Sequence, residues 1–577
     1  MLKLRTILNL GGINMSKHLN RDIRVPIEKD NPAILRFESL CIRCGQCKDI
    51  CQKQISVSHR YDLLKTNDTA ICIHCGQCAN VCPTHAIRER QDWMKVKDDQ
   101  QQGKKTVFIT SPSVRVALGE SFGLPAGSYV EEKMVGALRA LGADYVFDTT
   151  FAADLTIMEE ASELIHRIQN NKPLPQFTSC CPAWVKFVET YYPRYLPNIS
   201  TSKSPISMFA ATIKTWFAKR EGLDPTDISI VAITPCSAKK FEIQREEFHD
   251  ASEYHGMEAF QDCDHVVTTR ELANWLNAEN IDFTSIEDSQ YDTLMPRGSG
   301  AGIIFGNTGG VMEAAIRSAY YFLTGEQPGK DLLSLEAVRG MDGVREASLT
   351  IQDIPLRVAV IHGTDNARKF LHHMETTGTH YDFVEVMTCR GGCIGGGGQP
   401  IHLGEDQDAI RKQRIDALYD KDAVVTLRNS HENPQIQQLY EEFYGEPLSD
   451  LAEKLLHTSY HVRSDLNEDP SNYEWKEEVM EESKPSTGIH YKCSICGYIY
   501  EGDITQEEES YVCPICFVPK TMFEKMETEV VEETKKSTLQ YRCTICGYIY
   551  EGDLTQEPDS YVCPICGVPK TLFEPVA

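Results

Sequence analysis

The stretch Ile228–Lys240 reads ISIVAITPCSAKK, a run rich in β-branched residues that leads directly into Pro235 and Cys236. Such short apolar runs predict buried strands, and Thr106–Thr110 and Arg357–Ile361 have the same character. The pattern of Asp154–Gln169 predicts a helix between them. Strands that alternate with helices indicate an α/β fold, which binds ligands beyond the carboxyl ends of its strands. Cys236 is therefore expected at a ligand site.

The cysteines divide the 577-residue chain into several units. At roughly 150 residues per domain, this length predicts about four domains. The expected order is a leader over 1–30, a cysteine-rich block over 31–95, a large α/β unit over 104–460, an acidic linker over 464–488, and two small cysteine-rich units over 490–526 and 540–577 separated by a charged spacer over 527–539. The sequence therefore predicts a multidomain protein.

Composition and charge exclude several classes of protein. The chain has 58 basic and 84 acidic residues, a net charge of −26, which argues against a nucleic-acid or anionic-membrane partner. No apolar run approaches the roughly 20 residues of a membrane-spanning helix. The first residues show no cleavage site for secretion, and Met15 is an alternative start to Met1. The 22 cysteines cluster as metal ligands do, so we expect a reducing, cytoplasmic location.

Eight cysteines between residues 41 and 82 form two runs of almost identical spacing. In bacterial two-cluster ferredoxins, which these runs resemble, the fourth cysteine of each run serves the other cluster. That rule assigns one [4Fe–4S] cluster to Cys41, Cys44, Cys47 and Cys82, and a second to Cys51, Cys72, Cys75 and Cys78. The resemblance implies an α+β ferredoxin-like domain that conducts electrons. A pair of zinc knuckles is the alternative, although it would not need this fixed spacing.

The end of the chain is a tandem repeat in which each copy carries two Cys-x2-Cys knuckles. The ligand sets are Cys493, Cys496, Cys513 and Cys516 in the first copy, and Cys543, Cys546, Cys563 and Cys566 in the second. Four thiolates suit zinc or a single iron. The aromatic surround and the second knuckle, Tyr-Val-Cys-Pro-Ile-Cys, resemble rubredoxin in the short form of rubrerythrin-like proteins. That resemblance implies two small metal-knuckle β domains that hold iron; zinc is the alternative.

Five further cysteines lie in three motifs of the α/β unit: TSCCPAW at 178–184, PCSAKK at 235–240 and EVMTCRGGCIGGGGQP at 385–400. The glycines of the third motif allow the backbone to approach a bulky anionic group closely. A phosphate-binding loop is the alternative, but no Lys-Ser/Thr pair follows the glycines. Four of the thiolates suit a third cubane and leave one cysteine over.

Together these motifs resemble the [FeFe] hydrogenases over residues 31 to about 455. The resemblance implies a large α/β catalytic domain with an H-cluster, which is a [4Fe–4S] cubane joined to a two-iron centre that carries CO, CN⁻ and an azadithiolate bridge. It places the cubane on Cys181, Cys236, Cys389 and Cys393, with Cys393 as the bridge to the two irons. Cys180 is the spare thiol, placed to exchange protons with the bridgehead amine.

The resemblance also implies a proton path from Cys180 through Glu160, Ser200, Glu163 and Arg167 to the surface. The spacing supports part of this path, because Glu160, Glu163 and Arg167 stand at i, i+3 and i+7 on one helical face. A thiol with a pKa near 8.5 is a workable proton donor and acceptor. An ordinary solvated charged face is the alternative interpretation.

Further positions match residues that contact the two-iron centre in the family. Lys239 and Ser113 match contacts to cyanide, while Met387 and Phe305 would line the diatomic ligands. The chain departs from the commonest family pattern in that Thr234 replaces Met, Ile206 replaces Gln and Ser111 replaces a small apolar residue. Changes of this kind around a cluster retune its potential.

The leading hypothesis is therefore reversible conversion of H2 to protons and electrons. The implied electron partner is ferredoxin or another redox protein, and the tail suggests a further route to a rubrerythrin-type acceptor. Assembly of the two-iron centre implies dedicated hydrogenase maturases. The alternative is a non-catalytic relative that assembles iron–sulfur clusters or senses H2.

Overall fold

The computed structural model describes residues 24–58 and 71–463, together with short elements between residues 490 and 575. The chain divides into two compact units, residues 1–475 and 476–577. The first unit holds both the cysteine-rich block at 31–95 and the α/β residues at 104–460. The expected linkers at 464–488 and 527–539, and residues 1–23 of the expected leader, lie outside the described residues.

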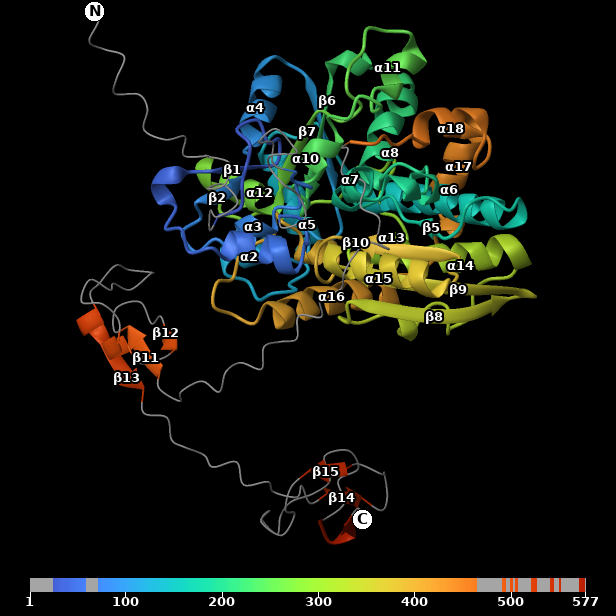
Figure 1. Ribbon diagram of the computed structural model, residues 1–577. Coiled ribbons are helices and arrows are strands. Elements are labelled where there is room, and N and C mark those ends of the chain that lie inside the picture. The colour runs from blue at the N-terminus through green and yellow to red at the C-terminus, as the bar shows by residue number, and fades with distance from the viewer. Residues whose placement is uncertain are drawn as a thin grey trace, which may run out of the picture. The chain divides into compact units, whose positions relative to one another are not determined.

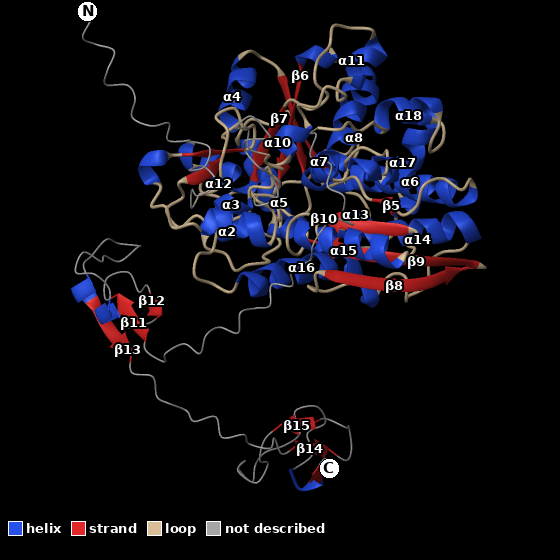
Figure 2. Cartoon of the chain, viewed as in Figure 1, coloured by secondary structure: helices blue, strands red, loops and turns tan. Residues whose placement is uncertain are grey.

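Two four-stranded sheets form the framework of the α/β residues. The first has the order β4-β3-β6-β7, formed by Tyr145–Asp148, Lys105–Thr110, Ile228–Thr234 and His265–Thr268, and all its strands are parallel. The second has the order β5-β10-β9-β8, formed by Gln176–Phe177, Phe383–Met387, Ile354–His362 and Val344–Ile351, with only β8 antiparallel. Both sheets lie among helices in Figure 2.

The predicted strands agree closely with the structure. Strand β6 spans the predicted Ile228–Thr234, and all its residues are buried, as expected for a central parallel strand. Strand β9 is longer than the predicted Arg357–Ile361 because it pairs with β8 over Ile354–Ile361 and with β10 as far as His362. The prediction that a helix begins at Asp154 is wrong: α6 spans Thr149–Gln169, since the Asp148 side chain accepts from the N–H of Thr150 and caps the helix earlier.

Several helices pack around the sheets and complete the core. These helices include α6, α7 (Pro182–Tyr191), α8 (Pro205–Thr212), α13 (Gly300–Ile304), α14 (Gly310–Thr324) and α16 (Gln407–Val424). Helix α6 contacts both α8 and α14, and the core around it includes Phe147, Phe151 and Phe209. This packing holds one end of α6 at the strand ends and directs its later turns toward Ser200.

The cysteine-rich block forms an antiparallel strand pair, β1 (Ile34–Arg36) with β2 (Ile87–Glu89), and two short helices, α2 (Gln46–Lys53) and α3 (Gln77–Asn80). These elements lie together at one side of the first unit in Figure 1. Residues of the expected leader also pack here, because Val25 is buried and its N–H donates to the Cys47 sulfur at 3.4 Å.

Each tandem copy in the second unit contains a three-stranded antiparallel sheet. The strands are β11 (His490–Cys493), β12 (Ile499–Glu501) and β13 (Phe523–Met526) in the first copy, and β14 (Gln540–Cys543), β15 (Ile549–Glu551) and β16 (Phe573–Pro575) in the second. Cys493 and Cys543 end the strands β11 and β14, respectively. The other expected ligands, Cys496, Cys513, Cys516, Cys546, Cys563 and Cys566, lie outside the described residues.

Candidate active site

A single cavity lies where strands of both sheets end. Ser111, Thr149 and Cys236 follow β3, β4 and β6 of the first sheet, and Cys180 and Cys389 follow β5 and β10 of the second. Carboxyl ends of parallel strands are where α/β folds bind ligands. The structure thus places the cysteines of all three motifs around one cavity of about 80 Å³. One water needs roughly 10–15 Å³ on this measure, so the cavity suits a group of many atoms.

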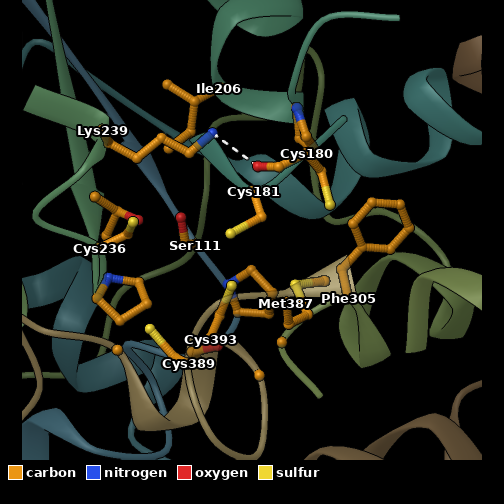
Figure 3. Close-up of a pocket in the computed structure, with 18 of the residues that line it drawn as sticks. Ser111, Cys180, Cys181, Ile206, Cys236, Lys239, Phe305, Met387, Cys389 and Cys393 are labelled. Atoms are coloured by element: carbon orange, nitrogen blue, oxygen red, sulfur yellow. Dashed lines mark hydrogen bonds between the residues drawn. The ribbon is translucent and has the colours of Figure 1, made fainter. Parts of the chain in front are cut away.

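Four cysteine sulfurs face this cavity. In Figure 3, Cys181, Cys236, Cys389 and Cys393 turn their sulfurs toward a common space, while the Cys180 sulfur lies apart from them on the side of Phe305. Among the described residues, no three His, Cys, Asp or Glu side chains could hold a single metal ion. The four cysteines whose sulfurs share this common space are Cys181, Cys236, Cys389 and Cys393.

The chemistry of these thiols fits the expected cluster. Burial raises the pKa of the Cys236 thiol to about 12 and also raises the pKa of Cys389 and Cys393. Metal binding deprotonates such thiols, and the resulting thiolates are the ligands that iron–sulfur clusters use. The walls are largely apolar, and a Cβ atom at Gly392 would lie 2.5 Å from the backbone nitrogen of Thr308. The glycine therefore lets the ligand loop approach the turn at Thr308.

Lys239 is the one charged side chain among the described residues that line the cavity. Its ammonium donates to the Cys180 carbonyl at 3.2 Å, the dashed line in Figure 3, and pairs with Glu242 at 2.7 Å. Both contacts fix a buried cation at the cavity wall. Ser113 also lines the cavity, and its buried hydroxyl has no hydrogen-bond partner among the described residues. These are the two polar groups that the sequence predicts as cyanide contacts.

The other residues predicted to contact the two-iron centre line this cavity, and so do the three positions that depart from the common family pattern. They are Met387, Phe305, Thr234, Ile206 and Ser111. A buried carboxylate that the sequence analysis missed fixes the neighbouring turn: Glu385 accepts from the N–H groups of Gly309 and Met312 at 2.6 and 2.8 Å. Only the packing of β10 against the start of α14 reveals this role, so no local sequence signal could have found it.

The expected proton-path residues lie along α6 and the segment after β5. Ser200 donates to Glu163 at 2.7 Å, and Arg167 donates to the same carboxylate at 2.7 and 3.0 Å. Arg167 also donates to the carbonyls of Pro197 and Ile199. The structure therefore joins Ser200, Glu163 and Arg167 in one hydrogen-bonded chain.

Glu160 lies one helical turn before Glu163 and is fully buried. Neither of its carboxyl oxygens has a hydrogen-bond partner among the described residues. Burial, reinforced by the charge of Glu163, raises the pKa of Glu160 to about 8. Glu160 also lies close enough to raise the pKa of the Cys180 thiol, although burial is the larger cause there. Glu160 and Cys180, which form the inner half of the expected path, therefore lie close together.

The cysteine-rich block provides a second thiol-lined cavity. Cys51, Cys72, Cys75 and Cys78 surround it together with isoleucine and valine side chains. The other expected set is also gathered: Cys47 lies close enough to Cys44 and Cys82 for their charges to affect its pKa, which burial raises. Cys41 packs in the same cluster of side chains as Cys47 and Cys82. That cluster also contains Cys51, Cys72 and Cys78, so the block brings cysteines of both sets close together. The crossed assignment of these cysteines to two clusters stays a prediction.

Protein-family comparisons match most of the chain. Residues 104–397 match the family "Iron only hydrogenase large subunit, C-terminal domain", and 408–463 match "Iron hydrogenase small subunit". Residues 66–88 match a 4Fe-4S binding domain, and 491–524 and 541–574 each match the rubredoxin-like domain of rubrerythrin. None of the helices in the described residues has the length and apolar character of a membrane-spanning segment.

Individual relatives agree with these matches. Iron hydrogenase 1 of Clostridium pasteurianum is 40% identical over 77% of this chain and 78% of its own length. A solved variant of the [FeFe]-hydrogenase HydA1 from Chlamydomonas reinhardtii has 40% identity and a TM-score of 0.58, and covers 65% of this chain and 99% of that one. Protein NAR1 of Arabidopsis thaliana is 30% identical over 63% of this chain and 81% of its own length. The chain belongs to the iron-only hydrogenases, enzymes that oxidise and produce H2, and it carries a 4Fe-4S binding segment and two rubredoxin-like segments.

Proposed function

We propose that this hydrogenase works with an H-cluster held by Cys181, Cys236, Cys389 and Cys393, with Cys393 bridging to the two-iron centre. The convergence of four cysteine sulfurs on one apolar cavity carries this proposal. When bound, the H-cluster supplies the iron at which H2 is formed or split. Lys239 and Ser113 line the cavity and would offer hydrogen-bond donors to its cyanides, while Met387 and Phe305 would lie against its diatomic ligands and exclude water.

The proposed proton route begins at the Cys180 thiol and continues through Glu160, Ser200, Glu163 and Arg167. With a pKa of about 8, the Glu160 carboxyl is protonated at neutral pH yet can release its proton. Ser200 can pass a proton to the Glu163 carboxylate because its hydroxyl both donates and accepts. Arg167 holds Glu163 in place near the end of the path. In this route the protons pass among Cys180, Glu160, Ser200 and Glu163, while the Arg167 guanidinium keeps its own protons and positions Glu163.

Electrons are proposed to travel through two [4Fe–4S] clusters. The set Cys51, Cys72, Cys75 and Cys78 is the nearer to the cavity, since the loop with Cys75 and Gly76 touches Gly397 and Ser237. The set Cys41, Cys44, Cys47 and Cys82 then provides the exit, and partly exposed Cys41 and Cys44 suit exchange with ferredoxin or another redox protein. Cluster potentials near −400 mV, as in plant-type ferredoxins, suit such a low-potential couple.

The rubredoxin-like units are proposed to hold one iron each on their eight cysteines and to serve a second acceptor of the rubrerythrin type. The fusion of these units to a hydrogenase is the observation that motivates this partner. Removal of residues 464–577 tests it. Electron delivery to ferredoxin should persist while delivery to a rubrerythrin-type acceptor falls; equal delivery to both acceptors by the shortened chain would contradict the role.

Replacement of Cys180 tests the catalytic proposal against a non-catalytic role in cluster assembly or H2 sensing. In protein assembled with hydrogenase maturases, Cys180→Ser should retain the infrared bands of iron-bound CO and CN⁻ but lose at least about a hundredfold in H2 evolution. Cys263→Ala is the control, since Cys263 is buried in the core and is not among the residues that line the cavity. Parent-like turnover by Cys180→Ser would contradict the proton role, and absence of turnover in the parent would favour the non-catalytic alternative.

A further inference from the structure

Gln77 connects the cysteine-rich block to the proposed catalytic cluster. It begins the short helix α3, between Cys75 and Cys78, and its side chain is buried. Its Nε2 lies 3.2 Å from the sulfur of Cys389 and 2.9 Å from the carbonyl oxygen of Gly395. An amide of the electron-transfer segment therefore donates to a cysteine sulfur that lines the catalytic cavity.

The neighbours of Gln77 fix which end of its amide faces the sulfur. The Gly395 carbonyl can only accept, so it requires the NH2 group on that side. On the other side, Asn80 Nδ2 donates to Gln77 Oε1 at 3.4 Å and to the Gly396 carbonyl at 3.1 Å. Asn80 is held in turn by Arg270, which donates to its Oδ1 at 2.7 Å. The amide therefore presents N–H, and not its oxygen, to Cys389.

Close backbone packing keeps this contact in place. A Cβ atom at Gly397 would lie 2.2 Å from the carbonyl oxygen of Cys75, and one at Gly76 would lie 2.3 Å from Ser237 Oγ. A larger residue at Gly76 or Gly397 would therefore push apart the two loops that carry the cysteine ligands. The distance from Gln77 to Cys389 is therefore set by the fold and not by a free side chain.

We propose that Gln77 raises the reduction potential of the cluster that Cys389 ligates. This inference rests on the proposed function, in which Cys389 is a cubane ligand. Reduction adds a negative charge that is shared with the thiolate sulfurs, and an N–H donor stabilises the more negative state more strongly. Because Gln77 is buried, solvent screens this effect little. Gln77 thus links the loop of Cys75 and Cys78 to Cys389, and its effect on the potential would favour electron transfer to the catalytic cubane.

Gln77→Leu removes the donor at nearly constant volume. The test uses the full, maturase-assembled chain and follows the CO and CN⁻ infrared bands as the applied potential is varied, because these frequencies respond to the charge of the attached cubane. We expect the ratio of reduced to oxidised catalytic cubane at a fixed potential to fall three- to tenfold. Tenfold corresponds to a shift of 59 mV for a one-electron couple.

Thr364→Val is the matched control for loss of a contact between the same two regions. Thr364 Oγ1 donates to the Ile55 carbonyl at 2.6 Å and not to a cysteine sulfur, so its loss should leave the ratio unchanged. If Gln77→Leu fails to assemble, Gln77→Met provides a second variant of the same length without a donor. A parent-like potential in the Gln77 variant, or equal shifts in the Gln77 and Thr364 variants, would overturn the inference. Absence of the infrared bands in the parent would instead refute the proposed function and the inference with it.

Discussion

Ser200 donates its hydroxyl hydrogen to Glu163 Oε2 at 2.7 Å, although the two residues are 37 positions apart and come from different elements. The backbone N–H of Thr201 donates to the same carboxylate at 3.0 Å, and Arg167 closes its other side. Glu163 is therefore held from three directions, and its geometry toward Ser200 is fixed. This contact is the best-defined part of the proposed proton route.

Loss of the Ser200 hydroxyl should slow proton transfer without disturbing the cluster. In Ser200→Ala we expect H2 evolution to fall by at least about tenfold, because no hydroxyl would remain to carry a proton between Glu160 and Glu163. Assays should be made on protein with parent-like iron content and infrared bands. Ser202→Ala is the control: its buried hydroxyl has no hydrogen-bond partner among the described residues, so activity should be retained. Equal losses in both variants would point to a packing effect.

The buried Glu160 carboxyl should make folding stability depend on pH. Its pKa is about 8 in the folded protein and 4.5 ordinarily, so the folded state binds the extra proton between these values. Stability is full below pH 4.5 and decreases by about 1.4 kcal/mol per pH unit as the pH rises toward 8. Glu160→Gln should therefore gain thermal stability over the parent progressively between pH 5 and 8, as followed by the unfolding temperature.

Glu189→Gln provides a control of opposite sign. Burial opposes ionisation of Glu189, but Arg245 pairs with it at 2.7 Å and the net effect lowers its pKa. The ionised Glu189 therefore stabilises the folded state at pH values above the pKa of its carboxyl in the unfolded chain. This stabilisation is lost as the pH falls through the lower pKa of the folded protein. Glu189→Gln should therefore be less stable than the parent at pH 7. A Glu160→Gln advantage that does not grow with pH would contradict the assigned protonation of Glu160.

His457 ties the C-terminal part of the first unit to α6. Its Nε2 lies 3.0 Å from Glu159 and its Nδ1 lies 2.8 Å from Thr201 Oγ1. Burial lowers the pKa of His457, but Glu159 outweighs it and the net pKa is raised. His457→Gln should cost about 3–5 kcal/mol at pH 6, since Glu159 loses its buried cationic partner. The loss should shrink as the pH rises through the folded pKa; a loss constant from pH 6 to 9 would contradict the ion pair.

Iron content should distinguish ligand cysteines from other buried cysteines. Three cubanes, a two-iron centre and two single irons predict about sixteen irons per chain. Cys389→Ala should lose about four to six of them, while Cys263→Ala should lose none, since Cys263 packs in the core with Ile230 and Val266. Metal analysis per folded chain checks both variants, and the same analysis decides whether the rubredoxin-like segments carry iron or zinc.

The sequence predicted local features better than long-range ones. Strand β6 and the cysteine at its end were predictable, because a buried parallel strand is a continuous apolar run. The true start of α6 was not, because Asp148 both ends β4 and caps the helix, and the pattern of the following residues hid that boundary. The cysteine motifs likewise predicted which thiols would meet, and Cys180, Cys181, Cys236, Cys389 and Cys393 do line one cavity.

Contacts between distant segments could not be predicted from the chain itself. Gln77 and Cys389 are 312 residues apart, and only the packing of two glycine loops brings them together. Glu385 was visible in a motif, but its support of the Gly309 turn depends on where α14 begins. Glu160 was predicted on the proton path, yet the raised pKa of its carboxyl follows from tertiary burial. The residue types therefore indicated a metal-cluster site, while the fold determined the protonation of Glu160 and the contacts that Gln77 and Glu385 make.

The infrared spectrum of the full chain, assembled with hydrogenase maturases, tests the central claim most directly. The account predicts bands from iron-bound CO and CN⁻ in the parent and in Cys263→Ala, and their loss in Cys393→Ala, which removes the proposed bridge to the two irons. A parent spectrum without these bands, or bands that survive in Cys393→Ala, would contradict the assignment of this cavity as the H-cluster site.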